Sequence, residues 1–204
     1  MPILHQMHVS GNCYKVRLAA RQTGRSLTLK DYPLHGGLTR QPEFLAKNAN
    51  GRVPMLELDD GRCLPESGAI LWYLSEGTPL QPVDGWGRAE ALAWMFFEQY
   101  SHEPYVAVAR FWLRYAAPED LAKKRDRVPE WHERGYAALG VMETHLKTHD
   151  WFAGGRYSIA DIALYGYTHV ADEGGFDLTD YPAVRRWLDR VASQPRYVPL
   201  QELW

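Results

Sequence analysis

The sequence predicts an α/β domain over residues 1–76, followed by an all-α domain over residues 88–204. Three observations support this fold class. Residues 2–32 indicate a strand, a helix and a strand, an order typical of a right-handed βαβ unit. Residues 53–74 indicate a hairpin that leads into a helix. Residues 77–87 are rich in Gly and Pro, as a linker would be, and beyond them the hydrophobic pattern is wholly helical.

The first elements follow from short patterns. Residues 2–8 are moderately apolar and predict a strand that ends at a Ser-Gly pair. Residues 12–23 place small and branched apolar side chains on one helical face, and Gly24 follows where a left-handed C-cap belongs. Residues 26–32 alternate as a second strand. Residues 42–47 predict a short helix with Pro in its first turn.

The hairpin begins at a proline. Pro54 cannot donate to a strand ladder, so the strand over residues 55–58 must start there or lie at an edge. Asp-Asp-Gly supplies the turn before a return strand at residues 62–64. Glu66 and Ser67 then open a helix, where they either cap the first turn or help hold an anion beside it.

The second half contains aromatic residues at helical spacing between residues 88 and 115, and core packing is their simplest interpretation. Pro104 should kink this helix or end a segment of it. Further helices are expected over residues 129–146, 158–170 and 183–192. The aromatic stripe comprises Trp94, Phe97, Ser101, Tyr105, Val108, Trp112 and Tyr115.

One helix start has a complete capping signature. Ser158 is a favoured N-cap residue, and Asp161 has the spacing that lets its carboxylate reach back to the N-cap amide. We therefore expect a structural capping box at Ser158 and Asp161, important for folding rather than for chemistry.

Composition narrows the function classes. The 204 residues include 23 Lys plus Arg and 25 Asp plus Glu, without a basic block, which argues against nucleic acid or an anionic membrane as the main partner. No apolar run approaches the roughly 18 residues of a spanning helix. The two cysteines cannot form a disulfide framework. We therefore expect a cytoplasmic protein.

The turn at residues 10–13, Ser-Gly-Asn-Cys, joins the first strand to the first helix. Ser10 could cap the helix, and its hydroxyl could also donate to a thiolate and lower the pKa of a bound thiol. Cys13 is expected to be a small buried residue rather than a reactive thiol, and Cys63 is interpreted in the same way.

Residues 53–74, with Val-Pro, a hairpin and Glu-Ser-Gly-Ala-Ile-Leu-Trp-Tyr-Leu, resemble the glutathione-binding half of the glutathione transferase family. The resemblance implies a thioredoxin-like βαβαββα domain and a cis bond before Pro54. It also implies that the Val53 backbone pairs with the cysteinyl part of glutathione, and that Glu66 and Ser67 hold the γ-glutamyl end. Arg52 or Arg40 would bind the glycyl carboxylate, because guanidinium matches carboxylate.

The turn at Ser10 resembles two classes of this family. In serine-type transferases a Ser matching Ser10 activates glutathione, and in the nu class a T-x-N-x-x-K pattern pairs a Thr with a functional Asn, matching Ser10 and Asn12. The resemblance thus implies that Ser10 and Asn12 are catalytic and that glutathione is the co-substrate. A tyrosine-type mechanism is disfavoured, because Tyr14 lies inside the helix.

The second substrate is expected in the helical domain. Tyr105, Arg110 and Trp112 are its candidate contacts, and the substrate would be a small apolar electrophile or a disulfide. Family members are usually homodimers, so a homodimer is implied. The role of the protein stays open between detoxification, reduction and one metabolic step.

Three alternatives to a transferase are open. A nu-type disulfide reductase would use the same site with Asn12 dominant. A zeta-type isomerase would share the serine, but the Ser-Ser-Cys-Ser of that class is replaced here by Ser-Gly-Asn-Cys. A non-catalytic binding module could use the same fold.

The eight histidines do not indicate a metal site. His132-Glu133 lacks a second His at zincin spacing, and His145 and His149 form only a lone pair one turn apart. We expect these side chains at the surface and no metal.

Overall fold

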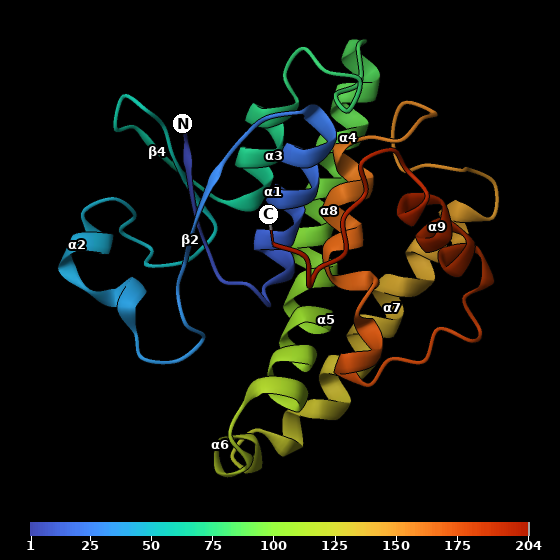
Figure 1. The fold of residues 1–204 in the computed structure, drawn as a ribbon. Helices are drawn as coiled ribbons and strands as arrows, with labels where there is room; N and C mark the ends of the chain where they lie inside the picture. The colour runs from blue at the N-terminus through green and yellow to red at the C-terminus, as the bar shows by residue number, and fades with distance from the viewer. Residues whose placement is uncertain (204) are drawn as a thin grey trace. The chain divides into compact units, whose positions relative to one another are not determined.

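The computed structural model describes residues 1–203 (Figure 1). The chain divides into two compact units. The first unit comprises Met1–Gln81 together with the C-terminal segment from Gln194, and the second comprises Pro82–Ser193. None of the helices in the described part of the chain has the length and apolar character needed to cross a bilayer.

The first unit is built on a mixed four-stranded sheet in the order β2-β1-β3-β4. β1 pairs in parallel with β2 and antiparallel with β3, and β3 pairs antiparallel with β4. The strands are β1 (Ile3–Gln6), β2 (Thr28–Asp31), β3 (Met55–Glu57) and β4 (Cys63–Pro65). The expected βαβαββα order is confirmed, although each strand is shorter than its pattern or shifted by one residue.

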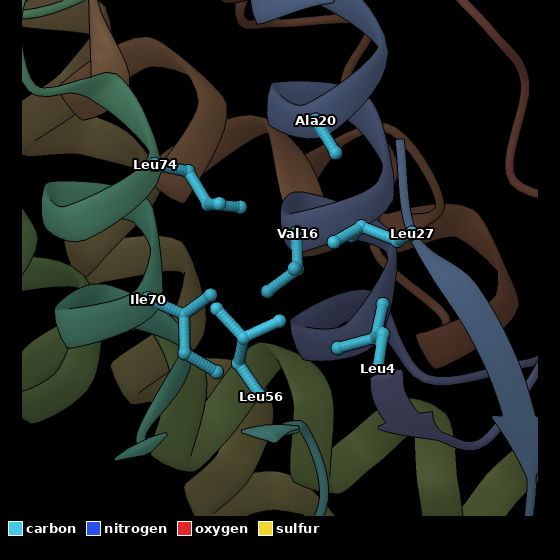
Figure 2. Close-up of a cluster of buried hydrophobic side chains, with 7 residues drawn as sticks. All are labelled: Leu4, Val16, Ala20, Leu27, Leu56, Ile70 and Leu74. Carbon is cyan, nitrogen blue, oxygen red and sulfur yellow. The ribbon is translucent and has the colours of Figure 1, made fainter. Parts of the chain in front are cut away.

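The helices of this unit are α1 (Gly11–Thr23), α2 (Pro42–Leu45) and α3 (Ser67–Ser75). α1 ends at Gly24, whose φ of 72° lies in the left-handed region that favours glycine. α1 and α3 contact each other and contribute to one apolar core with β1 and β3 (Figure 2). The core residues are Leu4, Val16, Ala20, Leu27, Leu56, Ile70 and Leu74.

Successive residues of β1 point to opposite faces of the sheet, so His5 does not share the core of Leu4. His5 is 1% exposed, and its ring nitrogens lie 2.8 Å from the Tyr32 hydroxyl and 2.7 Å from Glu57 Oε2. The ring of Phe44, in α2, packs edge-on against the His5 ring. The expectation that the histidines lie at the surface is therefore wrong for His5, because polar partners satisfy its ring inside the fold. It is also wrong for His102, which is 0% exposed.

The C-terminal segment packs on α1. The Tyr14 hydroxyl donates to the Val198 carbonyl at 2.7 Å, and the buried Arg17 guanidinium donates to the Leu200 carbonyl at 2.8 Å. The helical unit therefore does not extend to the C-terminus as the sequence suggested. The partners of α1 explain the difference, because its buried polar groups require acceptors that this segment supplies.

The second unit is helical between its irregular connections. Its helices are α4 (Gly85–Phe97), α5 (Glu103–Arg110), α6 (Pro118–Ala122), α7 (Val128–Leu146), α8 (Ile159–Thr168) and α9 (Pro182–Ala192). α4 starts three residues earlier than expected, because the Asp84 carboxylate accepts from the Gly87 amide at 2.9 Å and caps it. Pro104 lies in the first turn of α5, after a widened helical turn at Glu98–His102, so the expected interruption is present.

The aromatic stripe is not the buried face of α4 and α5. Its members are only partly buried, whereas the fully buried positions carry mostly small or unbranched side chains. The buried residues include Ala91, Met95, Glu98, His102, Val106 and Ala109. α4 contacts α8, and α5 contacts α7. Small residues let helices approach closely.

Candidate functional site

Ser10 is the N-cap residue of α1, with extended backbone angles. Its Oγ accepts a hydrogen bond from the Cys13 amide at 3.3 Å. A hydroxyl that accepts in this way still carries its own proton, which it can donate to a ligand. Ser10 is therefore both the cap and a half-buried donor at the start of α1.

The start of α1 carries the positive end of the helix dipole. Residues 11–14 are Gly, Asn, Cys and Tyr, so no carboxylate in the first turn offsets it. Cys13 does not compete as a nucleophile, since it is 0% exposed and burial raises the pKa of its thiol to about 11. The arrangement favours an anion brought by a ligand.

Asn12, in the first turn of α1, connects this helix to the start of α3. Its Oδ1 accepts from the Lys15 ammonium at 2.7 Å and from the Ser67 hydroxyl at 3.3 Å. Residues 55 positions apart in the sequence thus share one hydrogen-bonded cluster. The N-termini of α1 and α3 are therefore adjacent in the first unit.

Glu66, directly before α3, adopts φ 71° and ψ 119°, a conformation that L side chains rarely adopt. Within the described residues, its side chain makes no capping hydrogen bond to α3. The capping interpretation of Glu66 is therefore wrong, and its carboxylate is exposed beside the helix start. Strain of this kind costs about 1–3 kcal/mol and is typical of ligand sites.

The loop before β3 is held by Asn48. The Asn48 side chain donates to the Arg52 carbonyl at 2.8 Å and accepts from the Asn50 amide at 3.1 Å. The Val53–Pro54 peptide bond that follows is cis. The Arg40 guanidinium donates to the Asn50 carbonyl at 2.8 Å, so it supports the same loop.

Two of these residues were not among the sequence candidates. Lys15 stands where the T-x-N-x-x-K pattern has its Lys, and it lies three residues after Asn12, a spacing that places both on one helix face. Asn48 begins an Asn-Ala-Asn-Gly segment typical of an Asx turn. Both signals are local and could have been used.

The three candidates of the second unit have different surroundings. Tyr105 lines a cavity of about 390 Å³ together with residues of α7. Arg110 is 3% exposed and donates to Glu173 at 2.8 Å and to the Tyr115 hydroxyl at 2.8 Å, so its guanidinium has internal partners. Trp112 stacks on Trp131, with 6.3 Å between ring centroids.

The start of α8 contains a capping box. The Ser158 amide donates to Asp161 Oδ2 at 2.9 Å, and Ser158 Oγ accepts from the first turn of the helix. Asp161 also accepts from the Phe152 amide at 3.2 Å and from the Trp187 indole at 2.9 Å. Its carboxylate is fully buried, so it connects α8, α9 and the preceding loop.

Two family models match the chain. The N-terminal domain of glutathione S-transferases matches residues 4–82, and their C-terminal domain matches residues 92–195. Together these ranges include every candidate residue described above.

The names of two similar proteins indicate different activities. The disulfide-bond oxidoreductase YfcG of Escherichia coli is 31% identical over 90% of this chain and 87% of its own length. The maleylacetoacetate isomerase of Pseudomonas aeruginosa is 30% identical over 95% of this chain and 92% of its own.

Solved structures agree with the fold. A glutathione S-transferase from Pseudomonas fluorescens is 48% identical, has a TM-score of 0.94 and covers 98% of this chain and 99% of its own. Ure2p in complex with glutathione is 25% identical, with a TM-score of 0.83 and coverage of 96% and 95%. From its two matched domains and its structure, the chain belongs to the glutathione S-transferase family.

Proposed function

We propose that this protein is a glutathione transferase that binds glutathione in its first unit and presents the thiolate to a small apolar electrophile. The observation that carries the proposal is the 3.3 Å hydrogen bond between Ser67 and Asn12. It joins the two helix starts, so a tripeptide can have its thiol at α1 and its γ-glutamyl end at α3. Ure2p, which has a similar fold, was solved with glutathione bound.

Ser10 activates the thiol in this proposal. Its hydroxyl donates to the sulfur, and the start of α1 adds a positive potential, so both favour the thiolate over the thiol. The thiol proton leaves to solvent. The sulfur then forms a bond to the electrophilic carbon, and the leaving group departs with the electron pair of the bond that breaks.

The rest of the tripeptide has matching partners. The Glu66 carboxylate suits the γ-glutamyl ammonium, and the Ser67 hydroxyl and amide suit the γ-glutamyl carboxylate. The Val53 backbone, beside Pro54, pairs with the cysteinyl part. Arg52 is assigned to the glycyl carboxylate, because the Arg40 guanidinium already supports the loop through Asn50.

The test is a titration of the thiolate absorbance of bound glutathione against pH. We expect the bound thiol to have a pKa well below that of free glutathione, and Ser10→Ala to raise it. Ser26→Ala is the matched control, because Ser26 is an exposed serine of the same unit outside the site. A wild-type pKa equal to that of free glutathione would contradict the proposal.

A disulfide reductase is the second candidate function. Two observations support it. The Lys15 ammonium donates a hydrogen bond to Asn12, and the chain is similar to YfcG, which is named a disulfide-bond oxidoreductase. In this case Asn12→Ala, and not Ser10→Ala, should raise the pKa of the bound thiol. Comparing turnover of a small disulfide with turnover of an aryl halide separates the two functions, and absence of glutathione binding would favour a non-catalytic module.

We propose Tyr105 and Trp112 as contacts of the second substrate. Tyr105 borders a cavity of its unit that is lined by both apolar and polar side chains, and Trp112 is only partly buried. Substitution by Ala should raise KM for the electrophile and leave the affinity for glutathione unchanged. Unchanged KM values would remove both residues from the substrate site.

We also propose a homodimer in the cytoplasm. Phe96 and Tyr100 lie one helical turn apart and are 69% and 84% exposed, which is unusual for aromatic side chains that face only water. Light scattering of the wild type and of Tyr100→Glu tests the dimer, which the charge should weaken.

Both cysteines are thiols, as a reducing compartment would maintain them, and cell fractionation tests the location.

A further inference from the structure

Lys15 occupies a costly position. It is the fifth residue of α1, so its positive charge lies close to the positive end of the helix dipole. Its side chain is only 1% exposed, and burial of an ammonium is unfavourable unless polar partners compensate for it. The Asn12 amide oxygen, 2.7 Å from Lys15 Nζ, is one of the polar partners of this ammonium.

The contact with Asn12 settles which way the amide faces. A lysine ammonium has three donors and no acceptor, so the Asn12 atom 2.7 Å from Lys15 Nζ must be the amide oxygen. The Ser67 hydroxyl donates to the same oxygen at 3.3 Å. With Oδ1 held from two sides, the Nδ2 donor is directed away from Lys15 and Ser67.

Lys15 becomes more important once the ligand binds. A serine hydroxyl has one proton, and in the proposed function Ser67 gives it to the γ-glutamyl carboxylate. The Ser67 hydrogen bond to Asn12 is then lost. Lys15 is the donor that continues to hold the amide oxygen of Asn12.

We propose that Lys15 is a positioning residue for Asn12, whose amide it orients and polarises so that the Nδ2–H group donates to the sulfur of bound glutathione. The inference rests on the proposed function and adds Asn12 to Ser10 as a second donor to the sulfur. A positive donor on Oδ1 withdraws electron density from the amide, which makes its N–H groups stronger donors. Lys15 thereby supports the thiolate through Asn12 without touching it.

The experiment compares three variants by thiolate titration of bound glutathione. Lys15→Met removes the charge and the hydrogen bond but keeps an unbranched chain, and we expect the pKa of the bound thiol to rise by about one unit, or about tenfold less thiolate near neutral pH. Lys15→Gln keeps a neutral donor and should produce about half of this rise. Arg21→Met, the control, removes an exposed cation from the last turn of the same helix and should leave the pKa unchanged.

A double-variant cycle shows whether Lys15 acts through Asn12. If it does, Lys15→Met combined with Asn12→Ala should match Asn12→Ala alone within about 0.3 pH unit. Full addition of the two single effects would overturn the inference, because Lys15 would then act independently of Asn12.

Parallel measurements distinguish loss of folding in the variants from a direct effect on the pKa of the bound thiol. Glutathione affinity and thermal unfolding report whether each variant is folded, and Lys15→Gln keeps the test decisive if the Met substitution unfolds the chain. An unchanged thiol pKa in folded Lys15→Met or Lys15→Gln overturns the inference alone. A wild type that does not lower the thiol pKa overturns the proposed function as well.

Discussion

The starts of α8 and α1 both have a serine N-cap, yet only the first turn of α8 contains a carboxylate. At α8 the Asp161 carboxylate is 0% exposed and accepts from the Ser158 and Phe152 amides and from the Trp187 indole. At α1 the first turn has no carboxylate, and Ser10 is half-buried. The protein itself supplies a carboxylate at the first start, whereas in our proposal a ligand supplies the anion at the second.

The comparison teaches how to distinguish a structural cap from a binding site. A serine at a helix start is common to both, so the serine alone does not discriminate. The difference lies in whether the chain supplies a carboxylate as acceptor for the N–H groups around the helix start. In α8 it does so with Asp161, and at α1 the thiolate of a bound ligand would fill that role.

The largest expected effect is a loss of stability on substitution at the start of α8. Asp161→Ala leaves buried donors on Ser158, Phe152 and Trp187 without their acceptor, so the free energy of unfolding should fall by about 3 kcal/mol. Denaturant unfolding measures this. Ser158→Ala is the smaller control and should cost about 1 kcal/mol. Equal stability of Asp161→Ala and wild type would show that the box is dispensable.

Substitution of Ser10 at the start of α1 should lower the activity much more than the stability. Ser10→Ala should lower kcat/KM for the transferase reaction by about 100-fold, because a donor aimed at a developing or bound anion is lost. Its unfolding free energy should fall by only about 1 kcal/mol, the usual cost of an N-cap. Steady-state kinetics with parallel unfolding tests both, and a loss of stability without loss of activity would make α1 equivalent to α8.

The pH dependence of stability distinguishes the buried carboxyl. Burial raises the pKa of Asp161 to about 7, whereas an unfolded aspartate ionises near pH 4. As pH rises between these values the unfolded state releases its proton first, so this group destabilises the fold by up to about 1.4 kcal/mol per pH unit. Asp161→Asn should be less stable overall but should lack this slope, which unfolding at several pH values would reveal.

The smallest expected effect is that of substituting Glu66, at the start of α3. Glu66→Gly should relieve the strained backbone at φ 71° and stabilise the fold by about 1 kcal/mol, yet weaken glutathione binding about tenfold. Glu66→Ala keeps the strain and should weaken binding equally without the gain in stability. If binding is unaffected in both variants, Glu66 does not contact the tripeptide.

Local patterns predicted most of the elements. The left-handed Gly24, the proline at the start of α5 and the Ser-x-x-Asp spacing at α8 each have a direct chemical reason that requires only neighbouring residues. The buried face of α4 and α5 was mispredicted, because aromatic size suggested core. The buried positions include the small side chains of Ala91 and Ala109 instead.

The sequence by itself therefore determined the order of strands and helices, their caps and the resemblance to a glutathione-binding chain, since these depend on residues a few positions apart. Only the tertiary structure decided that Ser67 meets Asn12, that Asn12 Oδ1 is held by a buried Lys15, and that Val198 and Leu200 pack on the helix carrying the site. The physical reason is that hydrogen bonds between distant segments form only where packing brings their groups within about 3 Å.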